Sequence, residues 1–157
     1  MSNKSKGSTM ERELVKLFTE KGWRAARVAG SGVGDDSPCD IIAGKVGRKG
    51  VCVEVKSSRK ETIYITKAQI EDFLLFSSMI GTKAVIALRF LREGWLFIDP
   101  SELRDTGKLL GVHLKDARIR GKKFNQYFEE NEKEVPHDLV DDEHFKEDEV
   151  EEDKVID

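Results

Sequence analysis

Residues 40–56 read DIIAGKVGRKGVCVEVK, and their pattern indicates the centre of a β-sheet. Two short runs rich in β-branched residues, Asp40–Ala43 and Val51–Lys56, flank a segment of glycines and basic residues. Glycine-rich punctuation between two apolar runs is typical of a β-hairpin. We therefore predict two antiparallel strands, with alternate side chains of the second strand on opposite faces of the sheet.

Helical and strand patterns alternate on both sides of this hairpin. Apolar residues at helical spacing predict one helix over Thr9–Lys21, capped by Ser8 or Thr9, and another over Thr66–Ile80 with Thr66 as its N-cap. Further strands are predicted over Trp23–Ala29, Ala84–Leu88 and Trp95–Ile98. Together these elements predict an α/β fold in which helices flank a mixed central sheet of about four or five strands.

The predicted helix Thr66–Ile80 carries apolar residues on more than one face, which predicts burial on two sides. Part of this surface, around Phe73, Phe76 and Met79, is a candidate dimer interface. Burial inside one subunit explains the same pattern, so both alternatives stay open.

The charges divide the chain into a basic body and an acidic C-terminal segment. Residues 129–157 carry 15 acidic and three basic side chains, whereas residues 1–128 carry 24 basic and 15 acidic ones. This predicts a single domain over 1–128 followed by a disordered tail over 129–157. We expect the body to bind a polyanion. The tail either keeps the protein soluble, binds a basic protein partner or competes with the polyanion.

The compartment is predicted from what the sequence lacks. No segment reads as a signal peptide, and no apolar run approaches the roughly 20 residues that span a bilayer. We therefore expect an intracellular, cytoplasmic protein without membrane association. Cys39 and Cys52 lack the spacing of a zinc site and the density of a disulfide framework, so we expect both thiols to be reduced and buried.

Asp40, Glu54 and Lys56 form the chemically informative set. Glu54 and Lys56 lie two residues apart on one strand, so their side chains project from the same face about 7 Å apart. Asp40 opens the neighbouring strand and can lie close to Glu54. Two carboxylates and the backbone carbonyl of Val55 make an all-oxygen site suited to Mg²⁺, with Lys56 beside it. Phosphodiester hydrolysis requires such a metal and a nearby cation.

The same residues also fit a half-exposed strand with a cross-strand ion pair. Two features favour chemistry over this alternative. The charged residues share their face with Cys52, which we expect to be buried, and residues 30–38 form a polar, glycine-rich loop that lets a backbone approach. Lys56 either orients the attacking water or stabilises negative charge, and the sequence does not decide between these roles.

Four motifs, in order and at suitable separations, resemble those of the archaeal Holliday junction resolvases. They are GSTMEREL (7–14), RVAGSG (27–32), PCDIIA (38–43) and VEVKS (53–57). The resemblance implies a restriction-endonuclease-like core. It also implies a homodimer that binds a four-way DNA junction and makes paired, symmetric nicks with Mg²⁺ or Mn²⁺. The acidic segment 129–157 departs from the family pattern.

The resemblance also implies roles for individual residues. Asp40 and Glu54 would be metal ligands and Lys56 the catalytic lysine. Glu11 would complete the acidic cluster, Ser31 would approach the scissile phosphate, and Arg27 would contact the DNA backbone. Without the resemblance, Glu11 reads as a favourable acid in the first turn of a helix.

Basic residues near these motifs predict a DNA-binding face. We select Arg12, Arg27, Arg59 and Lys60; further candidates are Lys4, Lys6, Arg24, Lys45, Arg48 and Lys49. Any single one of them also fits a simple surface charge. Recognition of phosphates would make binding fall steeply with salt. Two other functions remain open: another nuclease of the same fold (flap, mismatch or duplex-cutting), and a catalytically silent DNA-binding protein.

Overall fold

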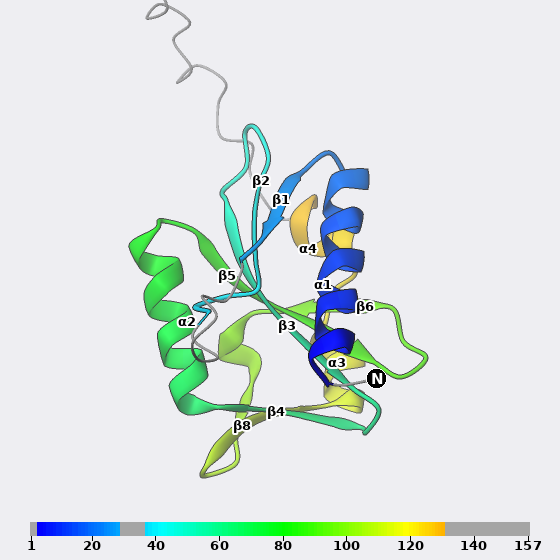
Figure 1. The fold of residues 1–157 in the computed structure, drawn as a ribbon. Helices are drawn as coiled ribbons and strands as arrows, with labels where there is room; N and C mark the ends of the chain where they lie inside the picture. The colour runs from blue at the N-terminus through cyan, green and yellow to red at the C-terminus, as the bar shows by residue number, and fades with distance from the viewer. Residues whose placement is uncertain (1–2, 29–36, 131–157) are drawn as a thin grey trace, which may run out of the picture.

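The computed structural model describes residues 3–28 and 37–130, with side chains from Ser8 onward. The elements follow one another as α1 (Asn3–Glu20), β1 (Arg24–Arg27), β2 (Ile41–Gly44), β3 (Val51–Ser58), β4 (Thr62–Thr66), α2 (Lys67–Met79), β5 (Lys83–Phe90), β6 (Trp95–Ile98), the 3-10 turn η1 (Pro100–Glu102), β7 (Arg104–Asp105), β8 (Leu109–His113), α3 (Leu114–Arg120) and α4 (Phe124–Phe128). Figure 1 shows α1 and α2 on opposite flanks of the strands.

The central sheet has five strands in the order β1-β2-β3-β5-β6. Neighbours are antiparallel except β3 and β5, which run parallel over their full lengths. Parallel strands require a crossover connection, and here β4 and α2 supply it. The mixed α/β architecture predicted from the sequence is therefore confirmed.

The predicted antiparallel hairpin is present as β2 and β3. Ile41 pairs with Val53 and Ile42 with Cys52, and the strands are antiparallel. Val53 and Cys52 are both fully buried but lie in different hydrophobic clusters, because successive side chains leave a strand on opposite faces. Strand β3 is thus buried on both sides before Glu54 is reached.

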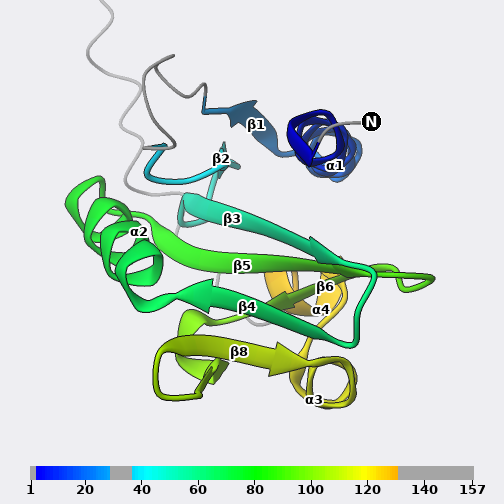
Figure 2. The same ribbon diagram turned by 60° about the horizontal axis from the view of Figure 1, so that its bottom comes forward.

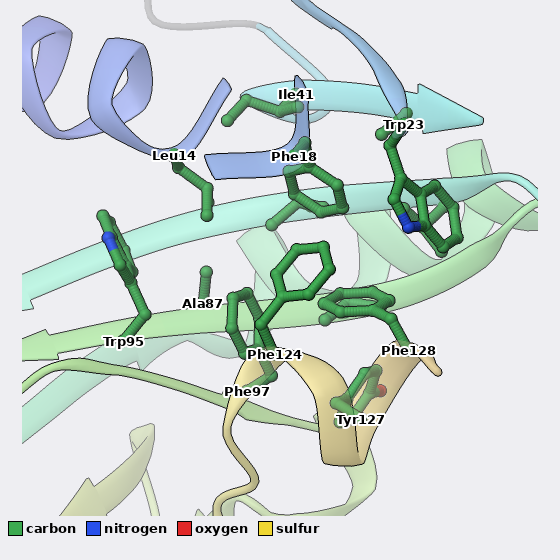
Figure 3. Close-up of a cluster of buried hydrophobic side chains, with 14 residues drawn as sticks. Leu14, Phe18, Trp23, Ile41, Ala87, Trp95, Phe97, Phe124, Tyr127 and Phe128 are labelled. Atoms are coloured by element: carbon green, nitrogen blue, oxygen red, sulfur yellow. The ribbon is translucent and has the colours of Figure 1, made fainter. Parts of the chain in front are cut away.

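One core lies between the central sheet, α1 and α4, and it is rich in aromatic residues. In Figure 3, Phe18 and Trp23 meet Phe97, Phe124 and Phe128. The ring centroids of Phe18 and Phe124 are 5.0 Å apart, as are those of Phe97 and Phe128, both in edge-on arrangements. The last helix is therefore an integral part of the domain.

The other core lies on the opposite face of the sheet, under α2 and a second sheet of strand order β4-β8-β7. Figure 2 shows α1 on one side of the central sheet and β4, β8 and α3 on the other. The sequence pattern did not predict this second sheet, α3 or α4. Strands β7 and β8 are short, and β8 pairs with β4, which is distant in sequence.

Helix α2 is confirmed, and its N-terminus follows the prediction. Thr66 is the N-cap: its side chain accepts a hydrogen bond from the Gln69 backbone N–H, and the Gln69 side chain bonds back to the Thr66 backbone. The expected start of α1 at Ser8 or Thr9 is wrong, since that helix begins at Asn3. Glu11 consequently lies well inside α1 and is not a first-turn acid.

Only one side of α2 is buried within the chain, by Ile70, Phe73 and Ser77. Leu75 and Met79 are exposed on the opposite side, and Leu74 beside the buried stripe and Ile80 at the C-terminal end are also exposed. The prediction of burial on two sides is therefore wrong for the single chain, and the apolar surface remains available to a partner. No helix within residues 3–28 and 37–130 combines the length and apolarity needed to cross a bilayer.

Glu129 is tied to the body at the position where we placed the start of the acidic tail. Its carboxylate accepts hydrogen bonds from Trp23 Nε1 and Lys45 Nζ, both at 3.1 Å. Arg48 lies 3.6 Å from the same carboxylate. Lys45 and Arg48, which we considered as DNA contacts, are thus already engaged inside the chain.

Candidate active site

Asp40 lies directly before β2 and is fixed by two hydrogen bonds to β3. Its backbone N–H donates to the Val53 carbonyl at 3.0 Å, and its Oδ2 accepts from the Val55 N–H at 2.7 Å. The backbone of β3 thus orients the Asp40 side chain towards the strand that carries Glu54. Sequence reasoning missed this side-chain to backbone bond, because nothing in the local pattern signals it.

Glu54 and Lys56 project from the same face of β3, as predicted from the strand periodicity. Lys56 Nζ lies 3.2 Å from Glu54 Oε1, and the two side chains are 25% and 15% exposed. This pair joins two residues of one strand, so it is not the cross-strand ion pair that we considered as an alternative to chemistry. It is half-buried and adjoins a second carboxylate, so it also differs from a solvated surface pair.

Both carboxyl groups have raised pKa values. Burial, followed by the charge of Asp40, raises the pKa of Glu54 to about 7, although Lys56 opposes the shift. Burial also raises the pKa of Asp40, against the lowering effect of the Val55 N–H. Neighbouring carboxyl groups whose pKa values are raised by burial are typical of functional sites.

Glu11 approaches this pair from α1 but is held by Arg27 of β1. Arg27 Nε lies 2.7 Å from Glu11 Oε2, and the side chains are 35% and 18% exposed. The charge of Glu11 raises the pKa of both Asp40 and Glu54, so it lies within electrostatic reach of them. The Glu11–Arg27 pair was not expected, because it depends on how α1 packs against β1.

The donor set fits a divalent cation. Asp40 and Glu54 supply oxygen ligands of the kind that Mg²⁺ prefers, and their mutual repulsion would be relieved by a bound cation. Within the part of the chain that the structure describes, no group of three or more His, Cys, Asp or Glu side chains is arranged to hold a metal. Glu11 thus influences the carboxylate pair electrostatically, while its side chain forms an ion pair with Arg27.

The remaining predicted residues lie as follows. Arg12 is exposed on α1, and Arg59 and Lys60 are exposed in the turn between β3 and β4. The Lys60 N–H donates to Ser58 Oγ at 2.9 Å, which helps to shape that turn. Ser31 lies outside the described residues, so its predicted approach to a phosphate stays a prediction.

Comparison with protein families gives one matching model. The family is described as archaeal Holliday junction resolvase (hjc), and the match covers residues 2–134. It therefore spans the hairpin, the acidic pair and the helix that ends at Phe128.

Named relatives agree with this match. The Crossover junction endodeoxyribonuclease Hjc of Archaeoglobus fulgidus is 35% identical over 135 residues, covering 81% of this chain and 98% of that protein. The protein of the same name from Methanocaldococcus jannaschii is 41% identical over 115 residues, covering 73% of this chain and 79% of that protein.

A solved structure agrees at the level of the fold. It is the 1.6 Å structure of Archaeoglobus fulgidus Hjc, described as a Holliday junction resolvase from an archaeal hyperthermophile. It superimposes with a TM-score of 0.69 at 30% sequence identity, over 76% of this chain and 98% of that one.

Proposed function

This chain belongs to the archaeal Holliday junction resolvase family, and we propose that it is an endonuclease that resolves four-way DNA junctions by paired, symmetric nicks. The restriction-endonuclease-like core expected from the sequence agrees with this membership. The observation that carries the proposal is the convergence of Asp40, Glu54 and Lys56 at one end of the β2–β3 hairpin.

Each residue of this group has a task that follows from its position. Asp40 and Glu54, with the Val55 carbonyl, would hold Mg²⁺, or Mn²⁺ in its place. Bound there, the metal would lower the pKa of a water molecule and neutralise charge on the phosphate. The Val55 N–H keeps the Asp40 carboxylate oriented. Lys56 already lies against Glu54, and its role would be to stabilise the negative charge that develops on the phosphate.

Glu11 of α1 and Arg27 of β1 would support the same chemistry. Glu11 adds negative charge near the carboxylate pair, which favours a cation there. Arg27 is held by Glu11, so its guanidinium is kept near the reacting phosphate. Ser31 would reach the scissile phosphate, and Arg12, Arg59 and Lys60 would contact the DNA backbone on either side.

We also propose a homodimer formed through the exposed side of α2. Opposed strands of a junction need two active sites, and a two-fold dimer matches the near two-fold symmetry of such DNA. The candidate surface consists of Leu74, Leu75, Met79 and Ile80, which are exposed in the single chain. The proposed substrate places the protein with the nucleoid, inside the cell.

Cleavage assays test the nuclease proposal. An immobile four-way junction and a linear duplex of matched sequence are incubated with the wild type, with and without Mg²⁺. Asp40→Asn is the informative variant, because its amide oxygen can still accept the Val55 N–H while the charge is lost. Glu20→Gln is the matched control: its side chain is 59% exposed and forms an ion pair with Lys16 at 3.9 Å on the surface of α1.

We expect symmetric nicks in the junction that require both Mg²⁺ and Asp40, with a loss of at least about 100-fold in Asp40→Asn. Glu20→Gln should cut like the wild type. Equal cutting of the duplex would indicate another nuclease of the same fold. Tight binding without cleavage by the wild type under any metal condition would indicate a DNA-binding protein.

A further inference from the structure

Two free thiols, each close in sequence to a residue of the acidic pair, contact one another. Cys39 Sγ and Cys52 Sγ lie 3.1 Å apart, and both residues are fully buried. A disulfide bond requires about 2.05 Å between the sulfurs, so an approach of about 1 Å would join them. The expectation of reduced, buried cysteines agrees with the structure, but their mutual contact was not expected.

Their location links the thiols to the carboxylates. Cys39 directly precedes Asp40, and Cys52 lies two residues before Glu54 on the same face of β3. Cys39 precedes β2 and therefore lies outside the regular strand pairing, although the adjacent Asp40 N–H is bonded to Val53. A bond between these sulfurs would fasten the segment that presents Asp40 to the strand that presents Glu54.

We propose that Cys39 and Cys52 are a site of reversible intramolecular disulfide formation. The oxidant is a small-molecule disulfide. The thiolate of one cysteine attacks it, forming a mixed disulfide and releasing one small thiol. The second cysteine then attacks the protein sulfur of this mixed disulfide and releases the second small thiol. Two electrons and two protons pass to the reagent, and one S–S bond forms in the protein.

Burial controls this reaction. Neither thiol contacts solvent in the folded state, so the reagent can react only after a local opening of residues 37–40. When residues 37–40 return to their folded position, the two sulfurs are again in contact. We therefore expect the internal disulfide to form and the mixed disulfide not to accumulate. The cross-link removes conformational freedom from the unfolded chain across a separation of 13 residues.

The test uses the full-length protein, exposed to oxidised glutathione at about 10 °C below its melting temperature, where local opening is frequent. A sample kept in a phosphine reductant is the reference. Both are then denatured, alkylated and weighed by mass spectrometry. We expect two alkylated thiols in the reduced sample, none in the oxidised sample, and a peptide that joins Cys39 to Cys52. The oxidised protein should melt higher by an amount on the order of 10 °C.

Cys39→Ser and Cys52→Ser are the single-thiol controls, and the Cys39→Ala/Cys52→Ala double variant replaces them if either serine disrupts the core. None of these variants should show the oxidant-dependent rise in melting temperature. Two alkylated thiols after oxidation, or a stable glutathione adduct in the wild type, would overturn the proposal. Junction cleavage at raised temperature, which rests on the proposed function, is a separate readout, because thiol counts and melting do not need nuclease activity.

Discussion

The Glu54 carboxyl group links the candidate active site to the stability of the fold. Its pKa is about 7 in the folded chain, against an ordinary value of 4.5 that applies when the chain is unfolded. The folded state therefore holds the proton more tightly. This contribution to stability is fully present below about pH 4.5 and is lost as the pH rises through about 7.

We expect the metal-free wild type to lose stability between pH 5 and pH 8, and Glu54→Gln to lose less. The difference between their changes in the free energy of unfolding should be on the order of 2 kcal/mol. Denaturant titrations in EDTA at both pH values measure it, with Glu20→Gln as the control. Identical pH profiles for wild type and Glu54→Gln would show that burial does not disfavour the ionised form of Glu54.

At pH 8, addition of Mg²⁺ should raise the stability of the folded state, which the rise in pH lowers. A cation that binds the ionised pair stabilises the folded state by mass action. We expect the melting temperature of the wild type to rise with Mg²⁺ concentration and that of Asp40→Asn to rise little. Scanning calorimetry over a range of Mg²⁺ concentrations measures this. Equal responses in both proteins would place the metal elsewhere.

At the residue level, the sequence predicted what depends on strand periodicity alone. Glu54 and Lys56 share a face because they lie two apart on one strand. The bond from the Val55 N–H to Asp40 and the pair between Glu11 and Arg27 depend on packing between elements. No local pattern of residue types encodes such contacts.

Among the elements, α2 provides the clearest test of assembly. Leu75 and Met79 are 61% and 77% exposed, whereas Phe73 is 2% exposed. We expect Leu75→Glu/Met79→Glu to be a folded monomer, because charges on a buried dimer surface are strongly unfavourable. Light scattering after gel filtration gives the mass, and circular dichroism verifies the fold.

That experiment has two controls, one on another exposed apolar residue and one in the core. Ile119→Glu alters an equally exposed apolar residue, 82% accessible on α3, and should leave the dimer intact. Phe73→Ala should cost about 3–5 kcal/mol of stability through the cavity it creates in the core. If Ile119→Glu alone gives monomers, the interface involves α3 and the assignment to α2 is wrong.

The elements differ in how well they could be predicted. The start of α2 is encoded within four residues by Thr66 and Gln69, and it was found. The short strands β7 and β8 and the helix α4 form through contacts with distant partners, such as Phe97 and Phe18 against Phe124. Such elements have weak local patterns, so periodicity did not reveal them.

In the whole molecule, Glu129 ties the start of the predicted acidic segment to the body. Partial burial raises the pKa of Glu129, but hydrogen bonds from Trp23 and Lys45 outweigh it and lower the pKa overall. Glu129 therefore stays ionised at neutral pH and connects α4 to the β2–β3 turn. A truncation that tests the acidic segment must accordingly be made after Glu130.

We expect removal of residues 131–157 to leave the melting temperature unchanged and to tighten junction binding at low salt. The segment carries 13 acidic and three basic side chains, so it should compete with DNA for the basic body. The gain should be at least about threefold at low salt and should vanish at high salt, where charges are screened. Fluorescence anisotropy of a labelled junction measures both conditions. Equal affinities of the full-length and shortened proteins at low salt would contradict competition with DNA. The acidic segment would then keep the protein soluble or bind a protein partner.

The β2–β3 hairpin has a consequence for how the candidate active site forms during folding. Asp40 and Glu54 are brought together by pairing between strands that are adjacent in sequence, whereas the parallel partner β5 joins only after α2 has crossed over. Contacts between near neighbours in sequence form with a low entropic barrier. The carboxylate pair should therefore arise early in folding, with the sheet closing around a site already assembled. Pulsed hydrogen exchange would then find the amides of Asp40 and Val55 protected before those of β6.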